Sequence, residues 1–252
     1  MAHRDELLQL LNSKLESGRV RDYCPNGLQV EGKAQIRKIL TGVTASQALL
    51  DRAVAEQADA VLVHHGYFWK NEASEVTGMK KRRLQTLLQH DMNLFAYHLP
   101  LDIHPELGNN AQLGALLGFD DISALASVEP VGVVRQSQLS AALSLADIVT
   151  RLQQQLGRPV FVHDAGIGDI RHIAWCTGGG QGYIDAAAAA GAQLFISGEV
   201  SEQTIHSANE LGIHFIAAGH HATERYGVKA LGEWLATQTD VQVVFADIYN
   251  PA

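Results

Sequence analysis

The chain has 252 residues, 46% of them hydrophobic, so it can bury one large core or two modest ones. Its net charge of −8 argues against a nucleic-acid-binding surface or a polybasic membrane patch, and no apolar run approaches the roughly 18 residues of a transmembrane helix. Only Cys24 and Cys176 are present and the polar start, M-A-H-R-D-E, is unlike a signal peptide, so a cytoplasmic location is expected.

The first elements of the chain form a β-α-β unit that follows a helix. Leucines at helical spacing predict an amphipathic helix over 4–17, and turn residues predict a loop over 22–32. A strand, a helix and a strand follow, which implies parallel strands joined by a right-handed crossover. Their predicted ranges are 38–43, 44–57 and 59–63.

Ala60–Trp69, which reads A-V-L-V-H-H-G-Y-F-W, is the most informative stretch. Its apolar start is typical of a buried strand, which ends at His64 and His65 before Gly66 lets the chain turn. Neighbouring side chains of a strand point to opposite faces, so adjacent histidines converge only where the backbone bends. They are better placed to hold one ion each of a close metal pair than to share one ion. The alternative is a surface histidine pair in a loop.

The rest of the first half contains one more strand with a histidine at its end. A loop, a basic-faced helix and a strand are predicted over 67–78, 80–89 and 93–97. His98 follows the strand, and the run H-L-P-L-D-I-H is predicted as a loop because Pro100 disfavours the α conformation of Leu99. A helix over 110–117 and an irregular segment over 120–134 come next.

The second half again alternates helices and strands. Helices are predicted over 145–156, 182–190, 202–211 and 223–237, and strands over 160–163, 171–176, 193–197, 213–218 and 241–248. The alanine-rich helix over 182–190 offers little polar surface to water, which favours self-association. T-G-G-G at 177–180 is interpreted as a tight turn rather than a phosphate cradle, since it lacks the Lys-Ser/Thr of a P-loop.

An internal repeat relates the two halves. Shifting the chain by 134 positions lays Leu40–His65 over Ala174–Glu199 without a gap, and matches Gln47 and Asp51 to identical residues. Both copies continue with a helix and a strand that ends near a histidine. Open α/β sheets bind ligands at the carboxyl ends of their strands, where these polar groups are expected.

The second half supplies further candidate ligands. His220 and Glu224, in G-H-H-A-T-E, are four residues apart at the start of a predicted helix, which places both side chains on one helix face. The alternative is helix capping, with Glu224 in the first turn. Asp102 follows His98 at the same spacing, but Pro100 intervenes, and a loop hydrogen-bond acceptor is the more common role of such an aspartate.

Strand ends that offer histidines and carboxylates together favour a two-metal site. Imidazole and carboxylate ligands suit zinc, iron or manganese, and without thiolates they do not choose among them. In this interpretation Glu224 bridges two divalent ions about 3.5–4 Å apart, which activate a water molecule. His98 is then a proton-transfer group or orients a ligand.

Five motifs of this chain resemble those of the Nif-three-like family, whose members are often labelled GTP cyclohydrolase type 2 homologues. They are D-Y-C-P-N-G-L-Q-V-E-G (22–32), V-H-H-G-Y-F-W (63–69), H-L-P-L-D (98–102), S-G-E (197–199) and G-H-H-A-T-E (219–224). The resemblance covers essentially the whole chain and is to the short bacterial members. It implies a toroidal homohexamer and a two-metal site with the ligands His64, His65, Asp102, His220 and Glu224.

We therefore expect an α/β protein of two related domains, with mixed or parallel sheets flanked by helices. A discontinuous metal-binding domain is expected over 1–125 plus 215–252, and a second α/β domain over 126–214. The favoured function is a metal-dependent hydrolase that acts on C–N bonds of a nucleotide or pterin-like small molecule, with two divalent ions per chain and His98 as the catalytic residue. The alternatives are a non-catalytic metal-binding, regulatory or metal-delivery protein, and a ring-shaped scaffold with vestigial metals.

Overall fold

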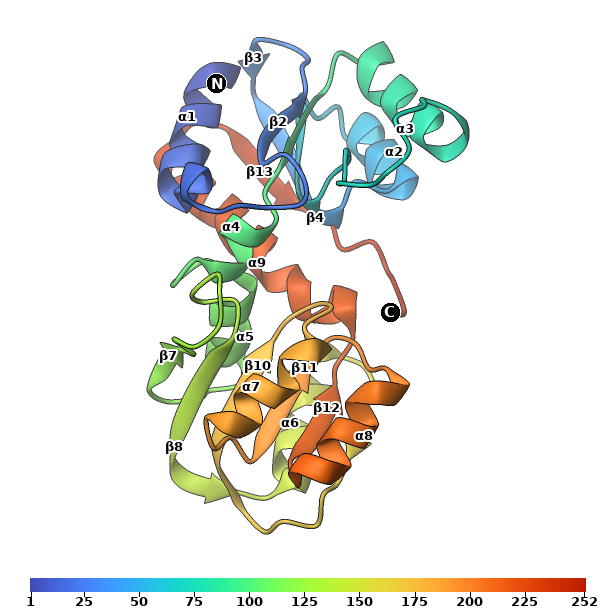
Figure 1. The fold of residues 1–252 in the computed structure, drawn as a ribbon. Coiled ribbons are helices and arrows are strands. Elements are labelled where there is room, and N and C mark those ends of the chain that lie inside the picture. The colour runs from blue at the N-terminus through green and yellow to red at the C-terminus, as the bar shows by residue number, and fades with distance from the viewer. The chain divides into compact units, whose positions relative to one another are not determined.

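The computed structural model describes residues 1–252, which group into two compact units (Figure 1). Unit 1 comprises Met1–Leu101 and Val228–Tyr249, and unit 2 comprises Asp102–Gly227 and Asn250–Ala252. The boundaries predicted from the sequence lie at 125/126 and 214/215. The difference arises because Leu113 and Tyr226 both pack into the core of unit 2. That either unit is an independent domain stays a prediction.

Unit 1 is built on a five-stranded sheet. Its strands are β2 (Gly27–Val30), β4 (Lys38–Thr44), β5 (Ala60–His65), β6 (Asn93–Ala96) and β13 (Gln242–Phe245), in the order β13-β4-β5-β6-β2. All neighbouring pairs are parallel except β2 and β6. The remaining elements are β1 (Ala2–His3), β3 (Gln35–Ile36), α1 (Arg4–Leu15), η1 (Ser17–Arg19), α2 (Gln47–Ala55) and α3 (Gly78–Gln89).

Helices cover both faces of this sheet. Leu49 of α2 and Leu87 of α3 belong to one core cluster with Val61 and Leu94 of the sheet, so α2 and α3 pack on the same face (Figure 1). On the other face, Gly232 of α9 (His220–Gln238) lies against side chains of β4 and β13. The sheet interior is therefore buried on both sides, which is why β5 begins with the continuous apolar run Ala60–Val63.

Unit 2 contains a six-stranded sheet. Its strands are β7 (Ile122–Ala124), β8 (Arg135–Leu143), β9 (Phe161–His163), β10 (Ile170–Cys176), β11 (Leu194–Ser197) and β12 (His214–Ala217), in the order β7-β8-β10-β11-β12-β9. Its helices are α5 (Asn109–Leu116), α6 (Leu145–Leu156), η2 (Gln181–Tyr183), α7 (Ile184–Ala189) and α8 (Glu202–Leu211). Helices α5 and α6 contribute to one core cluster, and α7 and α8 to the other.

The repeat seen in the sequence is present in the strand register. In unit 1, Ile39 lies opposite Ala60 in the parallel pair β4–β5, and in unit 2 Ile173 lies opposite Leu194 in the parallel pair β10–β11. Both residues of the second pair are 134 positions beyond those of the first. A third parallel strand follows in each unit, β6 or β12. The expectation of two related α/β units is confirmed at the level of strand pairing.

The spacing to that third strand differs between the copies. Ala60 pairs with Asn93 in unit 1, whereas Leu194 pairs with His214 in unit 2, after a much shorter connection. The extra residues of unit 1 include the aromatic loop between β5 and α3. The repeats also differ in the other neighbour of their first strand, which is the parallel strand β13 beside β4 and the antiparallel strand β8 beside β10.

Several predicted elements need correction. The predicted loop 22–32 contains β2, and β8 was missed, because its sequence R-Q-S-Q-L-S-A-A-L lacks an apolar run. Helix α9 begins at His220 rather than at 223. None of the helices is both long enough and apolar enough to cross a membrane.

The predicted loop 98–104 is wrong in its centre, where α4 (Leu99–Ile103) forms a short helix. Pro100 lies in the first turn of α4. Backbone N–H groups of a first turn have no partner within the helix, so a proline is tolerated there.

Candidate metal centre

Two of the predicted ligands stand at the carboxyl end of β5. His64 is fully buried, and its Nδ1 lies 2.9 Å from the carbonyl oxygen of Tyr97. Because a carbonyl only accepts, Nδ1 carries the hydrogen and donates it. His65 Nδ1 lies 3.2 Å from the Thr44 hydroxyl. The two imidazole centroids are 4.4 Å apart, so the rings converge where the strand ends, as expected.

His98 joins this pair from the end of β6. Its ring centroid lies 5.1 Å from that of His64 and 5.8 Å from that of His65. One ligand atom of each of the three histidines lies within 4.8 Å of those of the others, so together they could hold a metal ion. The sequence predicts that His98 transfers protons or orients a ligand, and this geometry also permits it to bind a metal. Its assignment as the catalytic residue stays a prediction.

Asp22, for which no role was predicted from the sequence, positions His98. His98 Nδ1 donates to Asp22 Oδ1 at 2.8 Å, and the same carboxylate accepts from the amide of Asn26 and from the backbone N–H groups of Tyr23 and Leu99. Burial works to raise the pKa of Asp22, but the hydrogen bonds and the charge of His98 outweigh it and lower the pKa to about 2. The carboxylate therefore stays ionised and fixes the imidazole.

Unit 2 presents its own donor set on the first turns of α9. His220 Nε2 lies 3.2 Å from Glu224 Oε2, in agreement with the spacing of four residues, and the Glu224 side chain is 4% exposed. His220 Nδ1 lies 2.7 Å from Glu199 Oε1. Burial alone lowers the pKa of His220, but the two carboxylates, Glu224 first, raise it to about 9.

The T-G-G-G turn after β10 passes directly beside these groups. Gly178 has φ +63°, and a Cβ at this position would collide with Glu224 Oε1 and approach His220 Nε2. Its N–H donates to the Thr223 hydroxyl at 3.0 Å. The backbone at Gly178 therefore packs directly against the Glu224 carboxylate, which leaves no room for a side chain. This agrees with the tight turn predicted from the sequence.

Asp102, the fifth predicted ligand, is a buried residue of α4. Its Oδ1 accepts a hydrogen bond from the Asn109 side chain at 2.8 Å, and Asn109 Oδ1 in turn accepts from the backbone N–H of Gly227. The residue therefore has the hydrogen-bonding role that was its alternative. A carboxylate oriented by an amide in this way also fits a metal ligand, because ligating carboxylates are themselves usually hydrogen-bonded.

The donor set of each unit is suited in its chemistry to transition-metal ions. His64 and His98 donate Nδ1–H to oxygen acceptors, so in their neutral rings Nε2 carries the lone pair. His220 donates Nδ1–H to Glu199 in the same way, and its Nε2 becomes available to a metal when the ring loses its second proton. Metal-binding histidines almost always donate their second ring nitrogen in this way. Imidazole and carboxylate donors suit zinc, iron and manganese.

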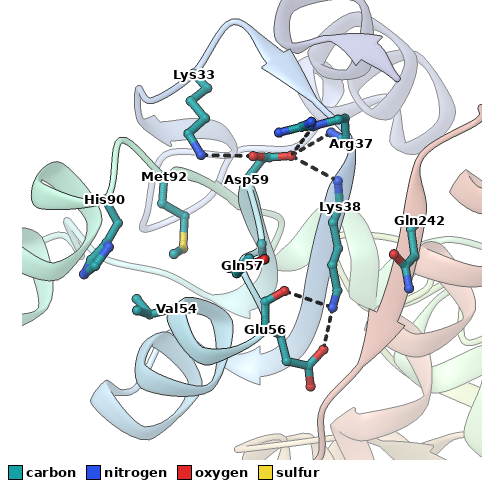
Figure 2. A pocket seen from close by; sticks show the side chains of 11 residues that line it. Lys33, Arg37, Lys38, Val54, Glu56, Gln57, Asp59, His90, Met92 and Gln242 are labelled. Carbon is teal, nitrogen blue, oxygen red and sulfur yellow. Dashed lines mark hydrogen bonds and ion pairs between the residues drawn. The ribbon is translucent and has the colours of Figure 1, made fainter.

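A cavity of about 850 Å³ lies elsewhere in unit 1, at the amino ends of the strands (Figure 2). Lys33 Nζ is 3.1 Å from Asp59 Oδ1, and Lys38 Nζ is 2.9 Å from Glu56 Oε2. Asp59 also accepts from the backbone N–H of Arg37. The charged groups thus pair with one another and link the amino ends of neighbouring strands. This is the end of the sheet opposite to the carboxyl end of β5, where His64 lies.

The comparisons with known proteins agree over the length of the chain. A family model described as Duf34/NIF3 (NGG1p interacting factor 3) matches residues 2–251. A Yersinia pestis protein named GTP cyclohydrolase 1 type 2 homolog is 59% identical over 248 residues, which are 98% of each chain.

Solved structures have the same fold. The structure of protein ybgI, described as of unknown function, is 56% identical with a TM-score of 0.94, and covers 99% of this chain and 100% of its own. TTHA1606 from Thermus thermophilus is 36% identical with a TM-score of 0.90, over 99% of this chain and 100% of its own.

Proposed function

Since this chain belongs to the Duf34/NIF3 family, we propose that it is a metal-dependent hydrolase with two divalent ions per chain. The proposed ligands are the five that the family resemblance implies, His64, His65, Asp102, His220 and Glu224. The substrate class is a nucleotide or a pterin-like small molecule, in keeping with the name that the Yersinia pestis relative carries.

The observation that carries the proposal is the fixed orientation of the imidazoles. His64, His98 and His220 are each held through Nδ1, by Tyr97, Asp22 and Glu199. A histidine that only fills a core does not need an acceptor that fixes its Nδ1–H. Metal binding or proton transfer at Nε2 accounts for the fixed Nδ1–H of all three histidines.

A bound metal pair supplies Lewis-acid activation of water and of the substrate at neutral pH. The chain's own groups do the rest. Glu224 would be one of the carboxylates that hold the ions, and Gly178 leaves room for its side chain. His98, with its Nδ1–H held by Asp22, accepts or returns a proton at Nε2.

Two aromatic side chains next to His98 support the proposal that the substrate is planar. The Trp69 ring centroid lies 4.9 Å from that of His98, edge to face, and the Tyr23 centroid lies 5.5 Å from it. Tyr23 is 53% exposed, so much of its ring surface can contact a ligand. Aromatic surfaces stack on planar heterocycles, which include nucleobases and pterins.

The first experiment is metal analysis of protein purified without added metal. We expect close to two transition-metal ions per chain, and a lower content in His64→Ala and Glu224→Gln. His206→Ala is the matched control, because that side chain is 70% exposed and lies outside the site. One ion or none in the unaltered protein would remove the two-metal mechanism.

The same sample is then screened for hydrolysis of nucleotides and reduced pterins. Release of product that disappears on chelation supports the hydrolase. Two tightly bound ions with no turnover on the whole panel would favour the alternative, a metal-binding or metal-delivery protein.

A further inference from the structure

We infer that Glu199 is a positioning residue for His220: it accepts the Nδ1–H of that imidazole and so directs Nε2 toward Glu224. The inference rests on the proposed metal-binding role of His220. It gives a role to Glu199 in the S-G-E motif (197–199), one of the five motifs that carry the family resemblance.

The contact itself is short and well oriented. Glu199 Oε1 lies 2.7 Å from His220 Nδ1, while the opposite nitrogen of the ring lies 3.2 Å from Glu224 Oε2. The imidazole therefore spans two carboxylates. Glu224 is itself a proposed ligand, so the carboxylate on the Nδ1 side is the one that remains to orient the ring when Nε2 ligates a metal.

Glu199 is held by its backbone surroundings and by a neighbour. Gly198 donates its N–H to the Gly178 carbonyl at 2.9 Å, and its own carbonyl accepts from Gly219 N–H at 2.9 Å. A Cβ at Gly198 would lie 2.8 Å from His220 Cα, so the segment runs directly against the start of α9. Gln181 Nε2 lies 3.4 Å from the second oxygen of Glu199.

The internal repeat gives an independent reason to single out this position. Glu199 is the counterpart of His65 under the 134-residue shift and lies two residues beyond the end of β11, the second strand of its repeat. In unit 1 that position places an imidazole 5.8 Å from His98, centroid to centroid. In unit 2 it places a carboxylate on His220. The same strand end thus carries a candidate ligand in one copy and an orienting acid in the other.

A carboxylate acceptor does more than a neutral one. It fixes the tautomer and also makes the imidazole a stronger electron donor. His64 has only the Tyr97 carbonyl in that position. Loss of such an orienting partner typically costs about 10–100-fold in metal affinity.

The test measures Zn²⁺ affinity by competition with a chromophoric chelator. We expect Glu199→Gln and Glu199→Ala to weaken the affinity for one of two ions about 10–100-fold, and Glu199→Asp to restore part of it. Glu202→Gln is the matched control, because that nearby carboxylate is 94% exposed and faces only the exposed His206. Unchanged affinity in both Glu199→Gln and Glu199→Ala would overturn the inference.

A crystallographic comparison of the metal-free proteins separates this inference from the proposed function. We expect the His220 ring to keep its orientation in the unaltered chain and to rotate or become disordered in Glu199→Ala. If the unaltered chain binds no Zn²⁺, the metal proposal fails, while a rotated ring still supports the positioning role. An unmoved ring in Glu199→Ala contradicts that role whatever the metal result.

Discussion

At the scale of single residues, Asp22 joins a loop to the end of β6. Its carboxylate accepts four hydrogen bonds, and its side chain is 2% exposed. Its pKa is lowered from 3.8 to about 2. A lowered carboxyl pKa stabilises the folded state above the unfolded value, and that stabilisation is lost as the pH falls from about 4 to about 2.

We therefore expect Asp22→Asn to lower the free energy of unfolding by about 2 kcal/mol at pH 7, the value of the pKa shift. The difference from the unaltered protein narrows below about pH 4, because Asp22 of the unfolded chain then binds a proton while the folded carboxylate, with its pKa of about 2, stays ionised. Urea denaturation across this pH range measures both effects. The exposed Asp185, changed to Asn, is the control, and an equal loss at all pH values would argue against the electrostatic explanation.

His98 could act as a metal ligand or as a proton-transfer group, and an experiment has to distinguish these two roles. If it transfers protons, His98→Ala keeps both ions and loses roughly 10²–10⁴-fold in turnover. Metal content and rate measured on one preparation give the answer. Loss of metal would make His98 a ligand, which its distances to His64 and His65 also permit.

At the scale of elements, the turn after β10 is the most constrained segment near the candidate ligands. We expect Gly178→Ala to displace Glu224, to lower the metal content and to destabilise the fold by about 1–3 kcal/mol, because it adds a collision to a strained φ. Gly182→Ala is the matched control, since nothing lies within 4 Å of a Cβ there. Metal analysis and thermal unfolding measure the two effects, and equal behaviour of the two variants would refute the constraint.

The same scale shows which elements a single sequence reveals. The continuous apolar runs of β5 and β11 were readable because both faces of each strand are buried. Strand β8 could not be predicted in this way, because its residues are only half buried and form no apolar run. Helix α4 was not predicted because its sequence contains Pro100, although a proline is tolerated in a first helical turn.

The orienting partners were out of reach for a different reason. Asp22 is 76 positions from His98, and Glu199 is 21 positions from His220. Local pattern predicts which residues end a strand. It does not predict which distant side chain will meet them once the chain has folded.

At the scale of the whole molecule, the resemblance to the Nif-three-like family predicts a toroidal homohexamer. Light scattering is expected to give a mass six times the 27.3 kDa of one chain. The alanine-rich helix adds less to this expectation than its sequence suggested, because Ala187 of α7 is buried in the core of its own unit. A strict monomer at micromolar concentration would contradict the prediction.

The fixed imidazoles also have a consequence for the speed of metal uptake. The rotamer entropy of His64, His98 and His220 is lost when the chain folds, since their partners belong to the fold, and not when an ion arrives. The net charge of −8 attracts cations over a distance. Capture is then governed by encounter, by shedding of the ion's water and by loss of the proton that His220 carries at neutral pH. In a stopped-flow record, uptake would follow the Zn²⁺ concentration and slow as salt is added.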